Sequence, residues 1–422
     1  MMPVPPLFHA APQDPLCLSQ GSVPHPNTPP CDKGILTDNF LYCKKGTYNI
    51  ANVAVPKGIA LPIKPLSLIA ALSGLACALL AGAASHAGSI AIQPPLNSSG
   101  GDCRMDGSRA VRLSTALTKG YGVQYWGASY NAEALSHLPH GMLIIEATRI
   151  GAPDSATGYE ERFSPEEIAL INHHGERPVL GYLNVGEVET YRDYWAHRPD
   201  GNPEWNGPVA GSGDHLSVFW SPDWHAIMLD RVDQLMQTGM DGLFLDDVLH
   251  YYTHAMDADL RWPAGHRPEG PADAPAMARE MMHLVRLIAD RARLWNCNAF
   301  IVVNNGAFIG RDAASDATLD GQQDFSAYLC AIDAILIENV SAPGTHGHTI
   351  EALQQDFRDN GVTVMSLDFA TSFPFAAPDD LDRIIVDIAR DRGFYPSLAH
   401  DGSFNRASEP ILLPKRPAVA QE

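Results

Sequence analysis

Two acidic residues follow directly on one short apolar stretch. In "DGLFLDDV" (241–248), Asp246 and Asp247 come at the end of a run of apolar residues. Burying a carboxylate is unfavourable unless a partner stabilises it, so such a pair indicates that the chain passes here from a core to a polar site. Carboxylates at such a site can transfer protons or act as nucleophiles.

Other apolar stretches between residues 121 and 400 also end in polar residues. These are Gln124, Trp126, Glu146, Asn184, Glu187, Asn304, Asn305, Glu338, Asn339, Asp368 and His400. Aromatic residues lie on or beside the same ends, namely Trp126, Tyr182, Tyr191, Tyr194, Trp195 and Trp220. Glycoside hydrolysis requires this combination, because one carboxyl group protonates the leaving oxygen and a second acts as nucleophile or base. For any single aromatic residue, packing in the core or at the rim is an equally good interpretation.

The segments that must position these residues alternate between strand-like and helix-like patterns along the chain. Apolar runs at 121–127, 141–148, 178–189, 241–248, 299–306, 334–340, 362–370 and 394–400 predict strands. Amphipathic runs at 164–175, 221–239, 276–295, 349–361 and 377–393 predict helices, several with Pro at the start and Gly at the end. The alternation favours an α/β fold with a single (β/α)8 TIM barrel over an open doubly wound sheet, and no Gly-rich dinucleotide motif follows the first strand.

In such a barrel the C-terminal ends of the strands form the active-site face. The polar strand ends are therefore expected to converge there. Because side chains alternate along a strand, Asp246 and Asp247 are expected to face opposite ways, one towards the barrel mouth and one towards the helices.

Three segments resemble a known family. "VLGYLNVGEVETYRDYW" (179–195), "FWSPDWHAIMLDRVDQLMQTGMDGLFLDDV" (219–248) and "AILIENV" (334–340) are similar to glycoside hydrolase family 114, the endo-α-1,4-polygalactosaminidases, and to the related branch of extracellular glycosidase-like or cysteinyl-tRNA-synthetase-like barrels. The resemblance covers roughly residues 121–400. It implies that Asp246 and Glu338 are the catalytic pair and that the reaction retains configuration.

The roles within that pair are predicted as follows. Asp246 is the nucleophile or base and Glu338 the general acid, although the roles can be exchanged; the apolar neighbours of Glu338 are expected to raise its pKa. Glu187 competes for either role, or else orients substrate or pairs with Arg192. The predicted substrate-binding residues are Trp126, Tyr182, Glu187, Tyr191, Arg192, Trp220, Asp247, Asn304, Asn305 and Asp368.

The chain also departs from the family pattern. Leu249 stands where relatives carry a further Asp, and a long insert, residues 250–275, follows the fourth strand. An insert of this length over the active face is expected to be a lid or a subsite wall. His250 and His254 have the i, i+4 spacing of metal ligands, but the pattern supplies no third ligand. No metal and no other cofactor is therefore predicted.

The N-terminal part predicts export. Residues 1–63 are Pro-rich and are expected to be a disordered extension or to lie upstream of the true start. Residues 64–87, from Lys64 through an apolar run to a cleavage site after Ala87, have the pattern of a signal peptide or else of a membrane anchor. A linker (88–120), the barrel (121–405) and a tail (406–422) follow. One disulfide is possible among Cys103, Cys297 and Cys330.

Composition limits the partners. The chain has 422 residues and a formal net charge of −20, which argues against nucleic acid as a partner.

Taken together, these features predict a secreted or periplasmic glycoside hydrolase that cleaves a polysaccharide or oligosaccharide containing amino sugar. No stable membrane insertion is expected after processing. An extracytoplasmic protein held by an anchor is the alternative for its location. A barrel that binds carbohydrate without cleaving it is the alternative function, and the two carboxylates at strand ends favour the enzyme.

Overall fold

The computed structural model describes residues 107–150, 160–257, 259–263, 265, 267–316 and 319–413. The predicted extension (1–63), the signal-like segment (64–87) and most of the predicted linker lie outside these residues. None of the helices formed by the described residues has both the length and the apolar character needed to cross a membrane. Cys297 and Cys330 are free thiols, and Cys103 lies outside the described part of the chain.

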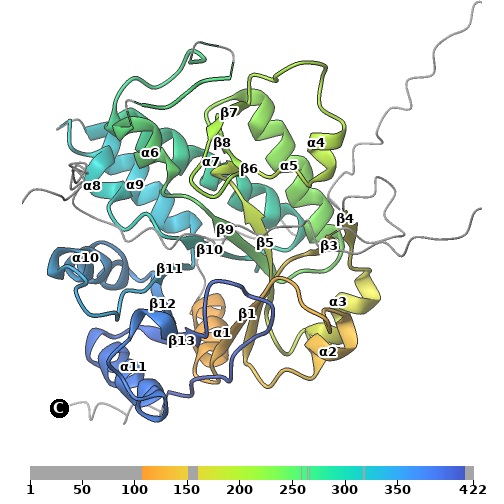
Figure 1. Cartoon of the computed structure of the whole chain (residues 1–422), viewed down its shortest axis with the longest axis vertical. Coiled ribbons are helices and arrows are strands. Elements are labelled where there is room, and N and C mark those ends of the chain that lie inside the picture. The colour runs from red at the N-terminus through yellow and green to blue at the C-terminus, as the bar shows by residue number, and fades with distance from the viewer. Residues whose placement is uncertain are drawn as a thin grey trace, which may run out of the picture. The chain divides into compact units, whose positions relative to one another are not determined.

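Eight parallel strands form one sheet, surrounded by helices, as predicted for a (β/α)8 barrel (Figure 1). In the order of the sheet they are β1 (Tyr121–Gln124), β2 (Met142–Ile145), β5 (Val179–Asn184), β9 (Gly242–Asp246), β10 (Phe300–Asn304), β11 (Ala334–Glu338), β12 (Thr363–Phe369) and β13 (Tyr395–Ala399). The two edges meet where the hydroxyl group of Ser397 in β13 donates a hydrogen bond to the carbonyl oxygen of Tyr121 in β1, at 3.1 Å. The predicted fold is therefore confirmed.

The helices begin and end largely where the Pro and Gly residues of the sequence predicted. They are α1 (Gly107–Leu117), α2 (Ala132–Ser136), α3 (Pro165–Ile171), α4 (Asp193–Ala196), α5 (Pro222–Gln237), α6 (His250–Met256), α7 (Ala274–Trp295), α8 (Ile309–Ala313), α9 (Leu319–Ala331), α10 (Gly347–Ala352), which continues into the turns η1 (Leu353–Phe357) and η2 (Arg358–Asn360), then η3 (Ala370–Ser372) and α11 (Pro378–Arg392). Pro165, Pro222 and Pro378 each lie in the first turn, where a missing N–H has no consequence.

Two small antiparallel sheets interrupt the βα rhythm. The strands β3 (Thr148–Ile150) and β4 (Glu160–Arg162) form a pair. The strands β6 (Glu187–Val188), β8 (His215–Ser217) and β7 (Asn206–Val209) form the second sheet. The predicted strand 178–189 is therefore two strands, β5 and β6. They are separated at Gly186, where an added Cβ would lie 2.1 Å from the carbonyl oxygen of Asp247.

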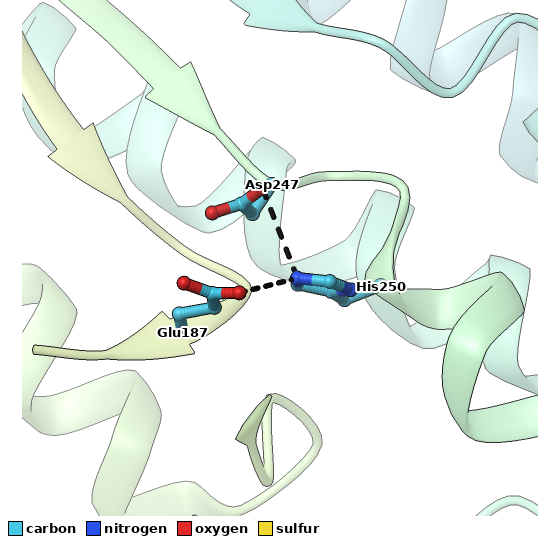
Figure 2. A group of neighbouring side chains, drawn as sticks. All are labelled: Glu187, Asp247 and His250. Carbon is cyan, nitrogen blue, oxygen red and sulfur yellow. Dashed lines mark hydrogen bonds and ion pairs between the residues drawn. The ribbon is translucent and has the colours of Figure 1, made fainter. Parts of the chain in front are cut away.

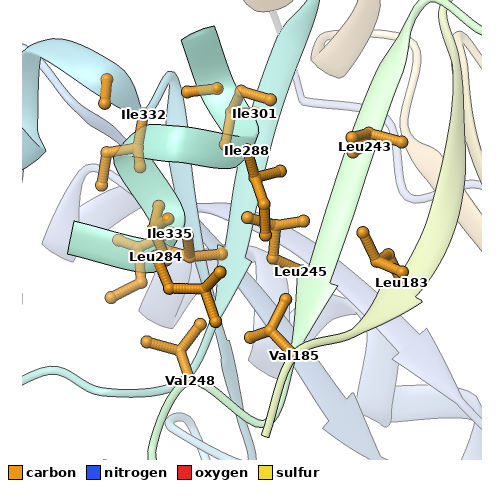
Figure 3. Packing of buried hydrophobic residues seen from close by; sticks show 14 of the residues in the cluster. Leu183, Val185, Leu243, Leu245, Val248, Leu284, Ile288, Ile301, Ile332 and Ile335 are labelled. Carbon is orange, nitrogen blue, oxygen red and sulfur yellow. The ribbon is translucent and has the colours of Figure 1, made fainter. Parts of the chain in front are cut away.

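Side chains of the barrel strands pack in two separate cores. Leu180, Phe244, Val302 and Leu336 belong to the cluster that fills the barrel. The alternate residues face outward and pack against the helices, as Leu243, Leu245, Ile301 and Ile335 do with Leu284 and Ile288 of α7 (Figure 3). The next inward positions at the C-terminal strand ends belong to Asn184, Asp246, Asn304 and Glu338.

Three strands are followed directly by a residue with a positive φ angle. Asp247, Asn305 and Asn339, with φ angles of 59°, 61° and 53°, follow β9, β10 and β11 directly. Asn and Asp adopt this left-handed conformation more readily than other non-Gly residues. The acidic and amide residues that the sequence places after these strands therefore also allow the chain to turn sharply at the barrel mouth.

Candidate functional site

Asp246 and Glu338 lie near each other at the barrel mouth. The side-chain nitrogen of Asn304 donates to Oδ1 of Asp246 at 2.7 Å and to Oε1 of Glu338 at 3.2 Å. Because one nitrogen serves both acceptors, the two oxygens lie within about 6 Å of each other. The ends of β9, β10 and β11 thus bring two carboxyl groups to one position, as the sequence predicted.

At least three donors serve the carboxylate of Asp246. Besides Asn304, the backbone N–H of Asp247 donates to Oδ1 at 2.8 Å and the hydroxyl group of Tyr182 donates to Oδ2 at 2.9 Å. Asp246 is 6% exposed. Hydrogen bonds of this kind favour the ionised form of a buried carboxyl group.

Tyr125 belongs to this group of residues, and sequence reasoning missed it. Its ring lies 4.7 Å from that of Tyr182, centroid to centroid. Burial, together with the charges of Asp246 and Glu338, raises the pKa of its hydroxyl group well above the ordinary value. The strand pattern contained the signal, because Tyr121 and Val123 face the barrel interior and Tyr125 is the next residue in phase.

Gln124 faces away from that group. Its side-chain nitrogen donates to the carbonyl oxygens of Trp126 and Asn405, at 3.0 and 3.3 Å, so Gln124 fastens the C-terminal segment to the end of β1. Trp126 itself is 39% exposed. Its backbone N–H donates to the carbonyl oxygen of Phe404 at 3.4 Å.

A second polar group consists of Glu187, Asp247 and His250, whose side chains point towards one another (Figure 2). Nε2 of His250 lies 3.0 Å from Oε1 of Glu187 and 3.7 Å from Oδ1 of Asp247. Burial lowers the pKa of His250, but the hydrogen bond with Glu187 and the charges of Asp247, Glu187 and Asp246 outweigh burial and raise it. Glu187 therefore pairs with His250, and the predicted pairing with Arg192 is not found among the described residues.

The direction predicted for Asp247 from strand alternation is wrong. β9 ends at Asp246, and the positive φ angle of Asp247 turns its side chain back towards the end of β5. There Oδ2 accepts a hydrogen bond from the side chain of Asn184 at 2.7 Å. The same nitrogen donates to the hydroxyl group of Tyr182 at 3.2 Å, which connects the two polar groups.

Arg192 is the centre of a buried network of ion pairs. It donates to Glu189 at 2.7 Å, to Glu146 at 2.9 and 2.8 Å and to Glu160 at 3.2 Å, and is 1% exposed. Burial opposes ionisation of Glu160, but Arg231 and Arg192 outweigh it and lower its pKa to about 2. The hydroxyl group of Tyr191 donates to Glu189, so the Tyr191–Arg192 pair is engaged within the protein.

Asn305 supports the catalytic candidates from the backbone side. Its own N–H donates to the carbonyl oxygen of Leu336 at 2.8 Å, and its side-chain oxygen accepts from the N–H of Glu338 at 3.5 Å. Asn305 thus fixes the end of β11, from which Glu338 projects.

Two predicted substrate residues lie away from Asp246 and Glu338. Asp368 is out of phase with the interior residues Leu367 and Phe369 of β12, and its carboxylate accepts from the N–H of Ser341 at 2.8 Å. Burial, against that hydrogen bond, raises its pKa to about 6. Trp220 is 8% exposed and belongs to the outer core, where its indole N–H donates to the carbonyl oxygen of Glu269 at 2.9 Å.

The insert after β9 is anchored by its histidines and tryptophan. His254 does not join His250, since its Nε2 lies 2.9 Å from the carbonyl oxygen of Ser217 and its ring stacks on Trp262. Burial lowers the pKa of His254 to about 3. A cavity of about 710 Å³ lies between residues 202–206 and the part of the insert that includes Trp262 and Arg267.

Comparison with known proteins gives partial sequence matches. No family model matches the chain. An uncharacterized protein of Thermotoga maritima is 31% identical over 147 residues, 34% of this chain and 42% of that protein. An uncharacterized protein of Deinococcus radiodurans is 28% identical over 219 residues, 50% of this chain and 62% of that protein. The chain therefore matches less than two thirds of the length of these relatives.

Solved structures with a similar chain path have low sequence identity. Aspergillus fumigatus Ega3, solved in complex with galactosamine, is 16% identical with a TM-score of 0.47, over 70% of this chain and 96% of that one. The glycoside hydrolase domain of PelA from Pseudomonas aeruginosa is 15% identical with a TM-score of 0.45, over 69% and 98%.

Proposed function

We propose that this protein is a glycoside hydrolase that uses Asp246 and Glu338 as its catalytic carboxyl groups. The observation that carries the proposal is the single Asn304 amide that donates to both carboxylates and keeps their oxygens within about 6 Å. Retaining glycosidases have carboxyl groups about 5–5.5 Å apart and inverting ones about 6.5–9.5 Å apart. An upper limit of about 6 Å for one pair of oxygens fits the retaining range better than the inverting one, and the resemblance of the sequence to family 114 agrees with it.

In the proposed mechanism Asp246 is the nucleophile. Its three hydrogen-bond donors favour the ionised form, which can attack the anomeric carbon while protonated Glu338 gives its proton to the leaving glycosidic oxygen. The glycosyl ester on Asp246 is then hydrolysed by a water molecule whose proton returns to the Glu338 carboxylate. Asn304 holds both groups in place throughout the cycle, and Tyr182 and Tyr125 form an aromatic wall beside them.

The proposed substrate is a polysaccharide that contains amino sugar. A protonated amino sugar is a cation, and the chain carries 49 acidic against 29 basic residues. Electrostatic attraction of this kind raises the local concentration of an oppositely charged substrate. The signal-like segment 64–87 supports export, so we infer that the polymer is met outside the cytoplasm.

A substrate panel tests this function. The full chain is incubated with de-N-acetylated galactosamine and glucosamine polymers and with neutral glucans, and the products are identified by mass spectrometry. We expect short oligosaccharides from an amino-sugar polymer, and none from the same polymer with the Asp246→Asn/Glu338→Gln double variant. A protein that binds the polymer in a pull-down but releases no oligosaccharide would be the carbohydrate-binding barrel instead.

Removal of the Tyr182 hydroxyl group is predicted to reduce activity without abolishing it. Hydrogen bonds to charged groups contribute about 1.5–3 kcal/mol. If Tyr182→Phe removes that much stabilisation from the transition state formed at Asp246, kcat/KM falls about 10- to 150-fold. Steady-state kinetics on a soluble oligosaccharide measures the change.

The matched control is Tyr328→Phe in α9. Among the described residues, the buried hydroxyl group of Tyr328 has no hydrogen-bond partner, so its removal is expected to leave kcat/KM unchanged. An equal loss in both variants would show that Tyr182 acts through general stability and not through Asp246.

A further inference from the structure

We propose that Glu187, Asp247 and His250 form a binding site for one divalent metal ion, Zn²⁺ in the first place, beside the carboxyl pair of the barrel mouth. The three residues come from different elements, β6, the turn after β9 and the first residue of α6 (Figure 2). One potential ligand atom from each lies within 4.8 Å of the others.

The spacing of these atoms fits a small ion. Ligands about 2.1 Å from a tetrahedral Zn²⁺ lie about 3.4 Å from one another. Nε2 of His250 lies 3.0 Å from Oε1 of Glu187 and 3.7 Å from Oδ1 of Asp247, on either side of that value. One imidazole nitrogen with two carboxylate oxygens is a donor set suited to Zn²⁺ or Mn²⁺.

Each of the three residues also has a polar atom on its outer side. A neighbour outside the group holds each of these outer atoms by a hydrogen bond. Nδ1 of His250 lies 3.0 Å from the hydroxyl oxygen of Thr253. Ser212 donates to Oε2 of Glu187 at 2.9 Å, and Asn184 donates to Oδ2 of Asp247 at 2.7 Å. Partners of this kind orient the ligands in known metal sites. The atoms that remain on the inner side of the group are Nε2 of His250, Oε1 of Glu187 and Oδ1 of Asp247.

The charge of the group also favours a cation. Glu187 is 1% exposed, so its negative charge has little access to water. With a neutral imidazole the group carries two negative charges, which a divalent ion would balance. Arg192 does not balance them, because Glu146, Glu160 and Glu189 engage it.

The location connects the ion to the barrel mouth. The side chain of Asp247 is 20% exposed, which leaves a coordination position accessible to water or to a hydroxyl group of a ligand. The N–H of the same residue donates to Oδ1 of Asp246 at 2.8 Å. An ion held by Asp247 would therefore fix the donor that serves Asp246, as a positioning element.

Metal binding to the full chain tests the site. The purified protein is stripped with chelator, loaded with Zn²⁺, dialysed and assayed for bound metal, and titration calorimetry gives the affinity. We expect one tightly bound Zn²⁺ and a higher Tm with Zn²⁺ than after chelation. In Asp247→Asn and Glu187→Gln the affinity should fall more than about 100-fold, since loss of an outer partner alone costs about 10- to 100-fold.

An exposed pair of histidines provides the control. His346 and His348 stack at 5.2 Å on the surface and can bind Zn²⁺ adventitiously. The His346→Gln/His348→Gln variant should keep the tight site. The proposal is overturned if the tight ion survives in both Asp247→Asn and Glu187→Gln, if it is lost only from the His346/His348 variant, or if the wild-type protein binds none. Binding is read without substrate, so the result is independent of hydrolase activity. Asp247→Asn decides the test if Glu187→Gln fails to fold.

Discussion

Glu338→Gln is expected to lose polysaccharide cleavage while it keeps kcat/KM for release of an acidic phenol from an aryl glycoside, since hydrolysis of the glycosyl ester, in which Glu338 is the base, does not enter that ratio. A general acid matters most when the leaving oxygen needs a proton, and such catalysis contributes about 10²- to 10⁴-fold. A phenolate of low pKa leaves without that proton. Asp246→Asn is expected to lose both reactions by at least the same factor, because no glycosyl ester can form. Parallel kinetics on polymer and aryl glycoside measure the two ratios.

The comparison also assigns the roles. If Asp246→Asn keeps the aryl glycoside reaction and Glu338→Gln loses it, the two roles are exchanged. Asp368→Asn is a matched control, because this carboxyl group also lies at a strand end but bonds to Ser341 and not to Asn304. Loss of activity in Asp368→Asn as large as in the other two would contradict the assignment to Asp246 and Glu338.

Arg192→Met is expected to lose more stability than either Arg192→Lys or a variant that lacks a surface ion pair. The substitution removes the shared partner of Glu146, Glu160 and Glu189. Within the described part of the chain, only Glu160 of the three keeps a second guanidinium, that of Arg231. Removal of one partner of a buried ion pair lowers the free energy of unfolding by about 3–5 kcal/mol, because the other charge stays buried without compensation. Since a whole domain is stable by about 5–15 kcal/mol, the variant should be marginally folded. Urea unfolding followed by circular dichroism gives the difference in the free energy of unfolding.

Two further variants make that prediction specific. Arg390→Met removes an exposed i, i+3 pair with Asp387, whose side chains are about half exposed, and should change stability little. Arg192→Lys keeps the charge but not the planar fork that serves three carboxylates, so an intermediate loss is expected. A loss in Arg192→Met no greater than in Arg390→Met would mean that the network contributes no more than a surface ion pair.

Much of the barrel could be predicted from the sequence because its strands are buried on both faces. All eight apolar runs correspond to barrel strands, although each run extends past its strand into the polar end. The sequence correctly placed Asp246, Asn304 and Glu338 at the barrel mouth, because each follows an interior residue, Phe244, Val302 or Leu336, by two positions. At β1 residue type favours the polar Gln124, whereas the phase of the interior residues Tyr121 and Val123 indicates Tyr125.

What the sequence did not predict depends on contacts between distant segments. The partners of Arg192 include Glu146 and Glu160, which are 46 and 32 residues away, and no local pattern links them. The group of Glu187, Asp247 and His250 depends on the positive φ angle of Asp247, which strand periodicity does not contain.

The seam of the barrel has a consequence for the order of folding. Ser397 meets Tyr121 across 276 positions, and Asn405 meets Gln124 across 281. Contacts between such remote segments form slowly, because a long loop must close first. The aromatic wall at Tyr125 lies at this seam, with the ring of Phe404 5.0 Å away. A folding intermediate with β2 to β12 assembled would thus already carry both carboxyl groups and Tyr182, and would gain Tyr125, the other member of the aromatic wall, last.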